Sequence, residues 1–332
     1  MKLIAETAWH HEGDMVFMNS LIDNICRSSA DIVKVHVLMD FDEYMEKNHP
    51  AYDTLSSWLI KKNDWLEIFN KISASGKELM ALLNDTGAVE LVSKCNPNYV
   101  EVHSVCLNDK NLLDSIKYNI NHSVPVVLGV GGSTIYEIEN AINTLKDFPI
   151  ILMFGFQNYP TKYEDINLAK IKRIMQAFPD YEYGYADHTA WDEPNNLLVT
   201  MLGAAQGVQY VEKHVTLNKG ENRTDFSAAI SFDELEELKR QMNLLDSMNG
   251  NGLLSLNEAE LKYCVPGLMK KAAILRKTKS AGEVLTWDDI VFKRSGQFTD
   301  MQQLDVWAKM GSKVVAGCVE GQAISSKTFS EE

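Results

Sequence analysis

The chain has 332 residues, of which 45% are hydrophobic and 23% charged, and its formal net charge is −14 at pH 7. The excess of acidic residues argues against a nucleic-acid groove, because neutralising phosphates needs clustered Lys and Arg. No apolar run reaches the roughly 18 residues of a membrane span. The opening MKLIAETAW lacks a basic segment followed by an apolar one, so no signal peptide is predicted and a cytoplasmic location is expected.

Short apolar runs alternate with amphipathic stretches over most of the chain. Eight of these runs are predicted to be strands: KLIAE, DIVKVHV, ELMALL, YVEVHS, PVVLGV, PIILMFG, YEYGYA and VQYVEKHV. Helical patterns lie between them, and SFDELEELKRQMNLLDSM follows the eighth run. Eight β/α repeats over about 245 residues, a length typical of the fold, predict a TIM barrel rather than an open doubly wound sheet.

A second domain is predicted after the barrel. The segment SMNGNGLLSLNEAE is rich in Asn and Gly and has the composition of a hinge. Beyond it, KKAAILRKTKSAGEVLTWDDIVFKRSG and GSKVVAGCVEGQAISSKTF indicate short strands with glycine turns, which together make a compact, mostly β module. We therefore predict a barrel over residues 1–247, a linker over 248–264 and a small β domain over 265–332.

Polar residues stand where the predicted strands end. Active sites of TIM barrels lie at the C-terminal ends of the strands, and several polar groups converging on one rim are what a site requires. In chain order the candidates are Glu6; Lys34 and His36; Asn84 and Asp85; His103 and Ser104; the loop from Gly129 to Gly132; Gln157 and Tyr159; Asp187 and His188; and Lys213 and His214.

Two of these candidates outline a metal site. The segment GYADHT carries His188, and VQYVEKHVTL, about one β/α unit later, carries His214. Both histidines follow strand-like runs, so we expect their imidazoles side by side at the ends of adjacent strands. A dication held by two neutral imidazoles keeps open positions for an aldehyde oxygen. The alternative is that each histidine is a hydrogen-bonded structural residue.

Two charged residues of the rim invite opposing interpretations. Lys34 lies inside the apolar run DIVKVHV, where an unpaired ammonium would be costly, so we expect it to face an anion at the barrel mouth. Pairing with an internal carboxylate and Schiff-base chemistry are the alternatives. Glu6 can orient a hydroxyl or a water, or it can be the buried partner of a lysine or a backbone amide.

A glycine-rich loop follows the fifth predicted strand. The segment LGVGGST contains Gly129, Gly131, Gly132 and Ser133. Its backbone N–H groups, at the start of a helix, can form an anion site. The alternative is a tight turn in which glycine only permits the backbone conformation.

Five segments resemble, in order, motifs of the sialic acid (N-acetylneuraminate) synthases and their nonulosonic acid relatives. AETAWHHEG resembles AEIGxNHxG, VKVH resembles VKxQ, NYPTKYEDINL resembles YPTPxED, GYADHT resembles GxSDHT and VEKHVTL resembles EKHFTL. KSAGEVLTWDDIVFKRSG resembles the signature of the antifreeze-like (SAF) domain. The resemblance covers nearly the whole chain and implies a metal-dependent TIM barrel followed by a SAF domain.

The resemblance also implies an activity. Members of the family condense phosphoenolpyruvate with an N-acylated hexosamine and use a divalent metal, Mn²⁺ first, with Mg²⁺ or Co²⁺ as alternatives. The residues that match the family motifs would ligate the metal through His188 and His214, and contact substrates through Glu6, Ser104, Gln157, Tyr159 and Asp225. Lys34 would supply positive charge for the donor.

The implied assembly is a homodimer that exchanges its SAF domains. Arg294, in FKRSG, resembles an arginine that in the family reaches across the dimer into the partner's active site. The alternative is a solvated arginine on the surface of the β domain.

The donor half of the site departs from the family pattern. Where the family has YKIGSGE, this chain has VEVHSVC, which places Glu101 at the lysine position and Cys106 at that of the acid. Gly129 and Ala186 stand where the family has serines. A carboxylate near a phosphate is unfavourable, so we expect weak binding of phosphoenolpyruvate unless the glycine loop supplies donors. The triple variant Glu101→Lys, Gly129→Ser and Ala186→Ser is expected to strengthen the binding of phosphoenolpyruvate.

The predicted function is therefore a metal-dependent condensation of phosphoenolpyruvate with an N-acylated hexosamine-type sugar. One alternative is a metal-assisted aldolase, lyase or isomerase that acts on a sugar without phosphoenolpyruvate. A second is a ligand-binding paralogue without catalysis.

Overall fold

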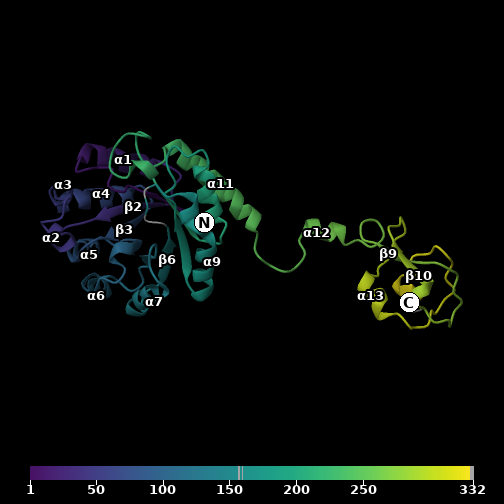
Figure 1. Ribbon diagram of the computed structural model, residues 1–332. Coiled ribbons are helices and arrows are strands. Elements are labelled where there is room, and N and C mark those ends of the chain that lie inside the picture. Colours follow the sequence, from purple (N-terminus) through teal and green to yellow (C-terminus); the bar gives the residue numbers. More distant parts are fainter. Residues whose placement is uncertain (156–157, 159, 330–332) are drawn as a thin grey trace. The chain divides into compact units, whose positions relative to one another are not determined.

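The computed structural model describes residues 1–155, 158 and 160–329. The chain divides into two compact units, Met1–Gly250 and Asn251–Glu332 (Figure 1).

The first unit is a closed barrel of eight parallel strands, which confirms the predicted TIM barrel. Strand β1 pairs with β2 on one side and with β8 on the other, so that Glu6 lies in register with both Lys34 and His214. The strands are β1 (Lys2–Glu6), β2 (Ile32–Val37), β3 (Glu78–Leu83), β4 (Tyr99–Val102), β5 (Val126–Gly129), β6 (Ile150–Phe154), β7 (Glu182–Ala186) and β8 (Tyr210–His214).

Helices surround the barrel (Figure 1). Several begin at side-chain caps, as at Asp14 and Asp85, and Thr134 with Glu137 forms the capping box that its S/T-x-x-E pattern favours. The helices of this unit are α1 (Met15–Arg27), α2 (Phe41–Tyr44), α3 (Tyr52–Ser56), α4 (Lys62–Ala74), α5 (Thr86–Val92), α6 (Lys110–Asn119), α7 (Ile135–Thr144), α8 (Tyr163–Ile166), α9 (Leu168–Ala177), α10 (Asn196–Ala204) and α11 (Phe232–Asn249), with short 3₁₀ turns at Ser104–Cys106 and Phe226–Ala228.

The alternation of side chains along the strands divides the core into two layers. On β1, Leu3 and Ala5 pack in the large core that includes the helices, whereas Ile4 belongs to a separate cluster inside the barrel. Successive side chains of a strand point to opposite faces, so Glu6, two residues after Ile4, also points inward. Apolar side chains fill the lower part of the barrel, and polar ones follow at its C-terminal mouth.

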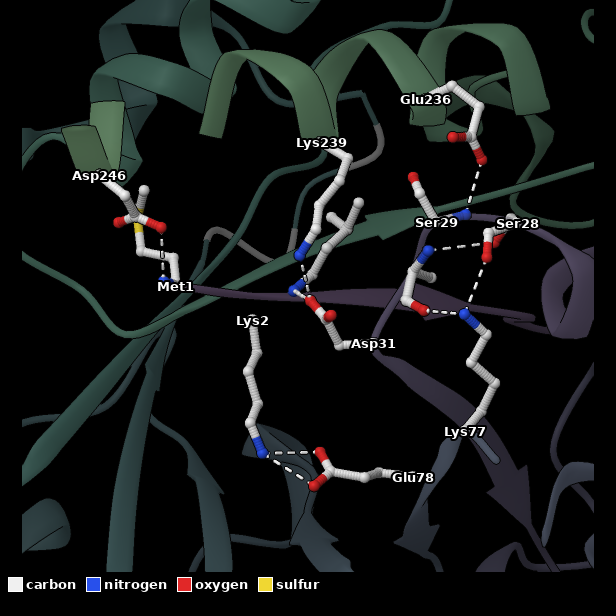
Figure 2. Close-up of polar contacts among 12 residues, drawn as sticks. Met1, Lys2, Ser28, Ser29, Asp31, Lys77, Glu78, Glu236, Lys239 and Asp246 are labelled. Carbon is white, nitrogen blue, oxygen red and sulfur yellow. Dashed lines mark hydrogen bonds and ion pairs between the residues drawn. The ribbon is translucent and has the colours of Figure 1, made fainter. Parts of the chain in front are cut away.

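Ion pairs hold the opposite end of the barrel (Figure 2). The Nζ of Lys2 lies 2.7 Å from a Glu78 oxygen, and the Nζ of Lys239, on α11, lies 2.6 Å from Asp31. These groups are partly exposed, so each pair stabilises the fold only modestly. This end of a TIM barrel serves stability rather than chemistry.

The second unit contains a two-stranded antiparallel sheet, formed by β9 (Ala272–Leu275) and β10 (Ile290–Lys293). Isolated bridges and a small core around Leu285 and Val306 complete it, and the prediction of a small, mostly β domain is confirmed. The predicted linker contains helix α12 (Glu258–Tyr263), and α13 (Gln303–Ala308) lies within the β unit. The assignment to the SAF family stays a prediction.

None of the helices in the described part of the chain is long and apolar enough to cross a membrane.

Candidate active site

Buried charged and polar side chains meet at the C-terminal mouth of the barrel. Strands β1, β2, β4 and β8 each contribute an inward-facing charged residue, and these side chains contact one another. The loops after β4 and β7 add histidines. A cavity here is lined by Glu6, Lys34, Glu101, His103, Ser104, Gly129, Met153, Phe154, Gly155, Ala186, His188 and Glu212. The candidates that sequence spacing predicted therefore lie largely together.

Lys34 is surrounded by carboxylates. Its Nζ lies 2.8 Å from Glu101, 3.0 Å from Glu212 and 3.4 Å from Glu6, and all four side chains are buried. Burial opposes the charge on Lys34, but the three carboxylates outweigh it and hold the Lys34 pKa well above its usual value. The expectation that Lys34 faces an anionic ligand is therefore contradicted. The alternative, pairing with internal carboxylates, is what the structure shows.

The cluster around Lys34 carries more negative than positive charge. Burial, followed by the charge of Glu6, raises the pKa of Glu212 well above its usual value, and burial likewise raises the pKa of Glu101. Both carboxyl groups are thus biased toward protonation, which relieves the excess charge. Glu212 did not stand among the sequence candidates. Its inward position could have been inferred because it lies two residues before His214 on the same strand.

Glu6 links the cluster to two histidines. One carboxylate oxygen contacts Nε2 of His36, and the other lies 3.5 Å from Nε2 of His214. Burial would raise the pKa of Glu6, but Lys34 and His214 hold it well below its usual value. Glu6 is therefore ionised. It is the buried partner of a lysine, which was the second of the two roles that the sequence allowed for it.

The rings of His188 and His214 lie side by side, which confirms their predicted placement. Their centroids are 4.8 Å apart at an interplanar angle of 87°. Burial, and next the neighbouring His214, lowers the pKa of His188 to about 3, so this ring is neutral, the form that binds metals. Within residues 1–155, 158 and 160–329, no three or more His, Cys, Asp or Glu side chains are grouped so as to hold a metal ion.

Asp187 and Lys213, also predicted at the rim, form a fully buried ion pair instead of facing a ligand. Nζ of Lys213 lies 2.8 Å from Oδ2 of Asp187, and the two side chains are 0% and 1% exposed. The hydroxyls of Thr189 and Thr200 each donate to Asp187 at 2.7 Å. This network fixes the ends of β7 and β8 and so positions the adjacent histidines.

The glycine loop and its surroundings correct one expectation. A Cβ at Gly129 would lie only 2.8 Å from the backbone nitrogen of Ser104, so a serine at position 129 has no room. Within the loop, the Ser133 N–H donates to the carbonyl of Val130 at 3.2 Å, and Gly132 has a φ of +76°. These features are those of a tight turn. The Ser104 hydroxyl is buried and has no hydrogen-bond partner among the described residues.

A second cavity, of about 190 Å³, lies beside this loop. Gly131, Gly132, Gly155, Lys170 and His188 are among its lining residues. It therefore joins the glycine loop to His188.

Four predicted substrate residues lie elsewhere in the chain or outside the described residues. Gln157 and Tyr159 fall outside the described residues. Asp225 lies in the loop after β8, where its carboxylate accepts a hydrogen bond from the Trp9 N–H at 3.1 Å. Arg294 is exposed in the second unit, and its Nε donates to the carbonyl of Met269 at 3.1 Å.

The mouth also holds His36 and His103, which were sequence candidates, and His10, which was not. His36 and His103 have ring centroids 6.3 Å apart, and His10 packs against His214 at 6.0 Å. Burial, then His214, lowers the pKa of His10 to about 4, and burial, then His36, lowers that of His103 to about 3. The histidine pair at positions 10–11, directly after a strand that ends in an acid, was the available signal for His10.

The matches to known proteins agree with this barrel. The model of the NeuB family matches residues 21–253. The chain belongs to the NeuB family. The prediction of a synthase-type enzyme of the nonulosonic acid synthase family is thereby confirmed. The SAF domain, the metal and the sugar stay predictions.

Individual relatives are distant but match over most of their length. The chain is 22% identical to the N,N'-diacetyllegionaminic acid synthase of Legionella pneumophila, over 89% of this chain and 85% of the relative. It is 24% identical to human N-acetylneuraminate-9-phosphate synthase, over 97% of this chain and 90% of the relative.

Solved structures share the fold. The N-acetylneuraminic acid synthetase of Leptospira borgpetersenii, 22% identical, superposes with a TM-score of 0.71 over 78% of this chain and 88% of that structure. A spore coat polysaccharide biosynthesis protein E from Chromobacterium violaceum, 18% identical, gives a TM-score of 0.82 over 99% of both chains. At these identities the likeness shows the fold alone.

The Asp187–Lys213 pair makes a prediction about stability. Asp187→Ala leaves a buried ammonium without a counter-charge, so we expect urea denaturation to show a loss of about 3–5 kcal/mol in the free energy of unfolding. Thr200→Val, which removes only one hydroxyl from the network, should cost about 1 kcal/mol. The double variant Asp187→Leu with Lys213→Met should be more stable than Asp187→Ala. Equal losses in Asp187→Ala and Thr200→Val would show that the ion pair does not hold the strand ends.

Proposed function

We propose that this NeuB-family barrel forms a carbon–carbon bond at the carbonyl carbon of an N-acylated hexosamine-type sugar, with a divalent metal, Mn²⁺ first, bound at His188 and His214. The observation that carries the proposal is the pair of adjacent, buried imidazoles at the mouth of the barrel. The names of the legionaminic acid, N-acetylneuraminate-9-phosphate and pseudaminic acid synthases among its relatives support a sugar-acid product.

The residues present fit a metal ion. His188 is neutral, and the carboxylate of Glu6 lies 3.5 Å from Nε2 of His214, so nitrogen ligands and negative charge are close together. A dication would also offset the excess of carboxylates around Lys34. When bound, such an ion supplies a Lewis acid that polarises a carbonyl oxygen.

The protein's own residues then hold and orient the reactants. The Asp187–Lys213 ion pair holds the ends of β7 and β8, where His188 and His214 lie. The carbonyl of His188 also accepts a hydrogen bond from the Thr161 N–H at 2.9 Å. Glu6, ionised and held by Lys34 and His36, can accept a hydrogen bond from a hydroxyl of the sugar. Burial of the whole set keeps water from competing for these contacts.

A second candidate function is favoured by the surroundings of Lys34. Phosphoenolpyruvate carries a carboxylate and a phosphate, yet the ammonium expected to receive it is already bound by three carboxylates. Like charges about 4 Å apart repel by roughly 4 kcal/mol at an effective dielectric of 20. A metal-assisted aldolase, lyase or isomerase that handles a less charged donor suits this cavity better.

The metal site is tested by removing its ligands. We expect His188→Ala and His214→Ala each to abolish stoichiometric Mn²⁺ binding in calorimetry. The proposed site has only these two imidazole ligands, so each variant leaves a single one. Circular dichroism should show an unchanged fold. His49→Ala, at an exposed histidine, is the matched control and should bind Mn²⁺ normally. Tight binding in the double variant would overturn the site and turn attention to His36 and His103.

The donor is tested at Glu101. Glu101→Gln keeps the shape of the side chain but can carry no negative charge beside Lys34. We expect it to strengthen phosphoenolpyruvate binding about tenfold, or 1.4 kcal/mol, in calorimetry with Mn²⁺ present. The exposed Glu90→Gln serves as control. The native protein could instead bind phosphoenolpyruvate at micromolar concentration, and Glu101→Gln could weaken that binding. This result would contradict the expectation and assign the anion site to the glycine loop.

Turnover separates the candidate functions. Release of inorganic phosphate that requires both phosphoenolpyruvate and an N-acylated hexosamine supports the synthase. Conversion of the sugar without phosphoenolpyruvate supports the second candidate. Bound Mn²⁺ without conversion of any sugar supports a ligand-binding paralogue.

We also propose a homodimer in which Arg294 of one subunit completes the barrel site of the other. An arginine on a tethered domain reaches a barrel mouth most easily when two subunits exchange domains across a two-fold axis. Light scattering should give twice the mass of the 37.4 kDa chain. Arg294→Ala should keep the dimer and weaken sugar binding, whereas Lys293→Ala should change neither. A monomer in solution would contradict the proposal.

A further inference from the structure

Two loops at the barrel mouth clasp each other. One follows β1 and spans residues 7–14, and the other follows β8 and spans 215–230. The Arg223 side chain donates to the carbonyl of His10 at 3.2 Å. The backbone and hydroxyl of Thr224 both donate to Glu12, at 2.7 and 2.9 Å. Together with the Trp9–Asp225 hydrogen bond, these contacts fix the first loop on the second.

The clasp holds strained backbone. Ala8, Glu12 and Asp225 have φ values of 46°, 45° and 64°, in the left-handed region that non-glycine residues rarely occupy. Ala8 stands where the family motif AEIGxNHxG has glycine, for which this conformation carries no steric penalty. The loop therefore keeps the left-handed conformation at position 8, although an alanine there disfavours it. Such strain persists where the surrounding structure enforces it, and it gathers at functional sites.

His10 is the residue that this loop shape places. Its side chain is fully buried, at 0% exposure, and its ring packs edge-to-face against that of His214. Its Nδ1 lies 2.6 Å from the carbonyl oxygen of Thr224. A carbonyl can only accept, so Nδ1 carries the proton. A second proton would leave a buried, charged N–H at Nε2 with no acceptor among the described residues, so Nε2 is a bare acceptor.

That acceptor has no hydrogen-bond partner among the described residues, although it is buried. A buried polar atom is nearly always paired, and an unpaired one indicates a group that arrives with a ligand or with water. The family motif has asparagine at this position, and asparagine reaches only as far as Nδ1 does. The acceptor at Nε2 is therefore a feature of this chain rather than of the motif.

We propose that Nε2 of His10 accepts a hydrogen bond from an O–H group bound beside His214, supplied by a water molecule or by a hydroxyl of the sugar. His10 thereby becomes a further binding residue of the site, with its ring orientation set by Thr224. This inference rests on the proposed function, since the O–H group is held there by the site that His188 and His214 form.

Two substitutions separate the nitrogens of the ring. His10→Asn keeps a donor where Nδ1 lies but removes the acceptor, whereas His10→Gln offers an oxygen near Nε2 and loses the donor to Thr224. Mn²⁺ alone is the first probe, and Mn²⁺ with N-acetylmannosamine, N-acetylglucosamine or N-acetylgalactosamine is the second. Calorimetry measures binding, and thermal melting without ligands reports the clasp.

We expect His10→Asn to melt like the native protein and to bind about tenfold more weakly, as partners of metal-site ligands do. A loss with Mn²⁺ alone identifies water as the donor, and a loss only with a sugar identifies a hydroxyl. His10→Gln should melt lower but recover most of the binding. The inference is wrong if His10→Asn binds like the native protein, or if His10→Gln binds no better than His10→Asn.

A measurement on the native protein covers the case in which His10→Gln does not fold. ¹⁵N NMR with diamagnetic Mg²⁺ should show Nε2 of His10 as an unprotonated nitrogen whose resonance moves when the ligand binds. An unmoved resonance overturns the inference. Failure of the proposed function is distinguishable, because the native protein would then not bind Mn²⁺, or would bind it still after His188→Ala.

Discussion

One ammonium group, that of Lys34, organises the mouth of this barrel. It binds carboxylates from three other strands, β1, β4 and β8, and all four side chains are buried. Removing one member of such a cluster destabilises a protein far more than replacing the whole cluster by apolar residues, because the remaining charges stay buried without partners. Glu6 extends the cluster to His36 and His214, so the positions of the histidines depend on Lys34 as well. The site is a single coupled unit.

The electrostatics of this unit favour a cation over an anion. Three acidic side chains face one ammonium: Glu6 is ionised, and Glu101 and Glu212 are biased toward protonation. The neighbouring rings of His10, His103 and His188 are kept neutral by burial. Burial in low dielectric strengthens whatever charge remains, because there is little water to screen it. A divalent metal at the proposed site would meet imidazole nitrogens and negative charge, whereas a phosphate would meet acidic side chains around Lys34.

The sequence predicted the barrel because its signal is local and repeated. Each strand is a short apolar run and each helix an amphipathic one, so eight units could be counted without knowing how they pack. The adjacency of His188 and His214 followed in the same way, since consecutive strands pair in a parallel barrel. The partners of Lys34 did not follow. β2 is separated from β4 by β3 and from β8 by β1, so their contacts across the barrel depend on closure and on side-chain length. Strand alternation would have placed Glu101 and Glu212 inward, and counting the inward carboxylates would have favoured an internal ion pair.

The departures from the family pattern compensate one another. Glu101 replaces a lysine, and it contacts Lys34, the positive charge that such a neighbour would have repelled. His36 stands where the motif has glutamine, and it contacts Glu6. Ala8 replaces glycine in a left-handed conformation, and the loop clasp around His10 enforces that conformation. Random loss of a donor site would leave buried charges without partners and would let a strained loop relax. Each of these three replacements has a partner instead, which argues against random loss of the site.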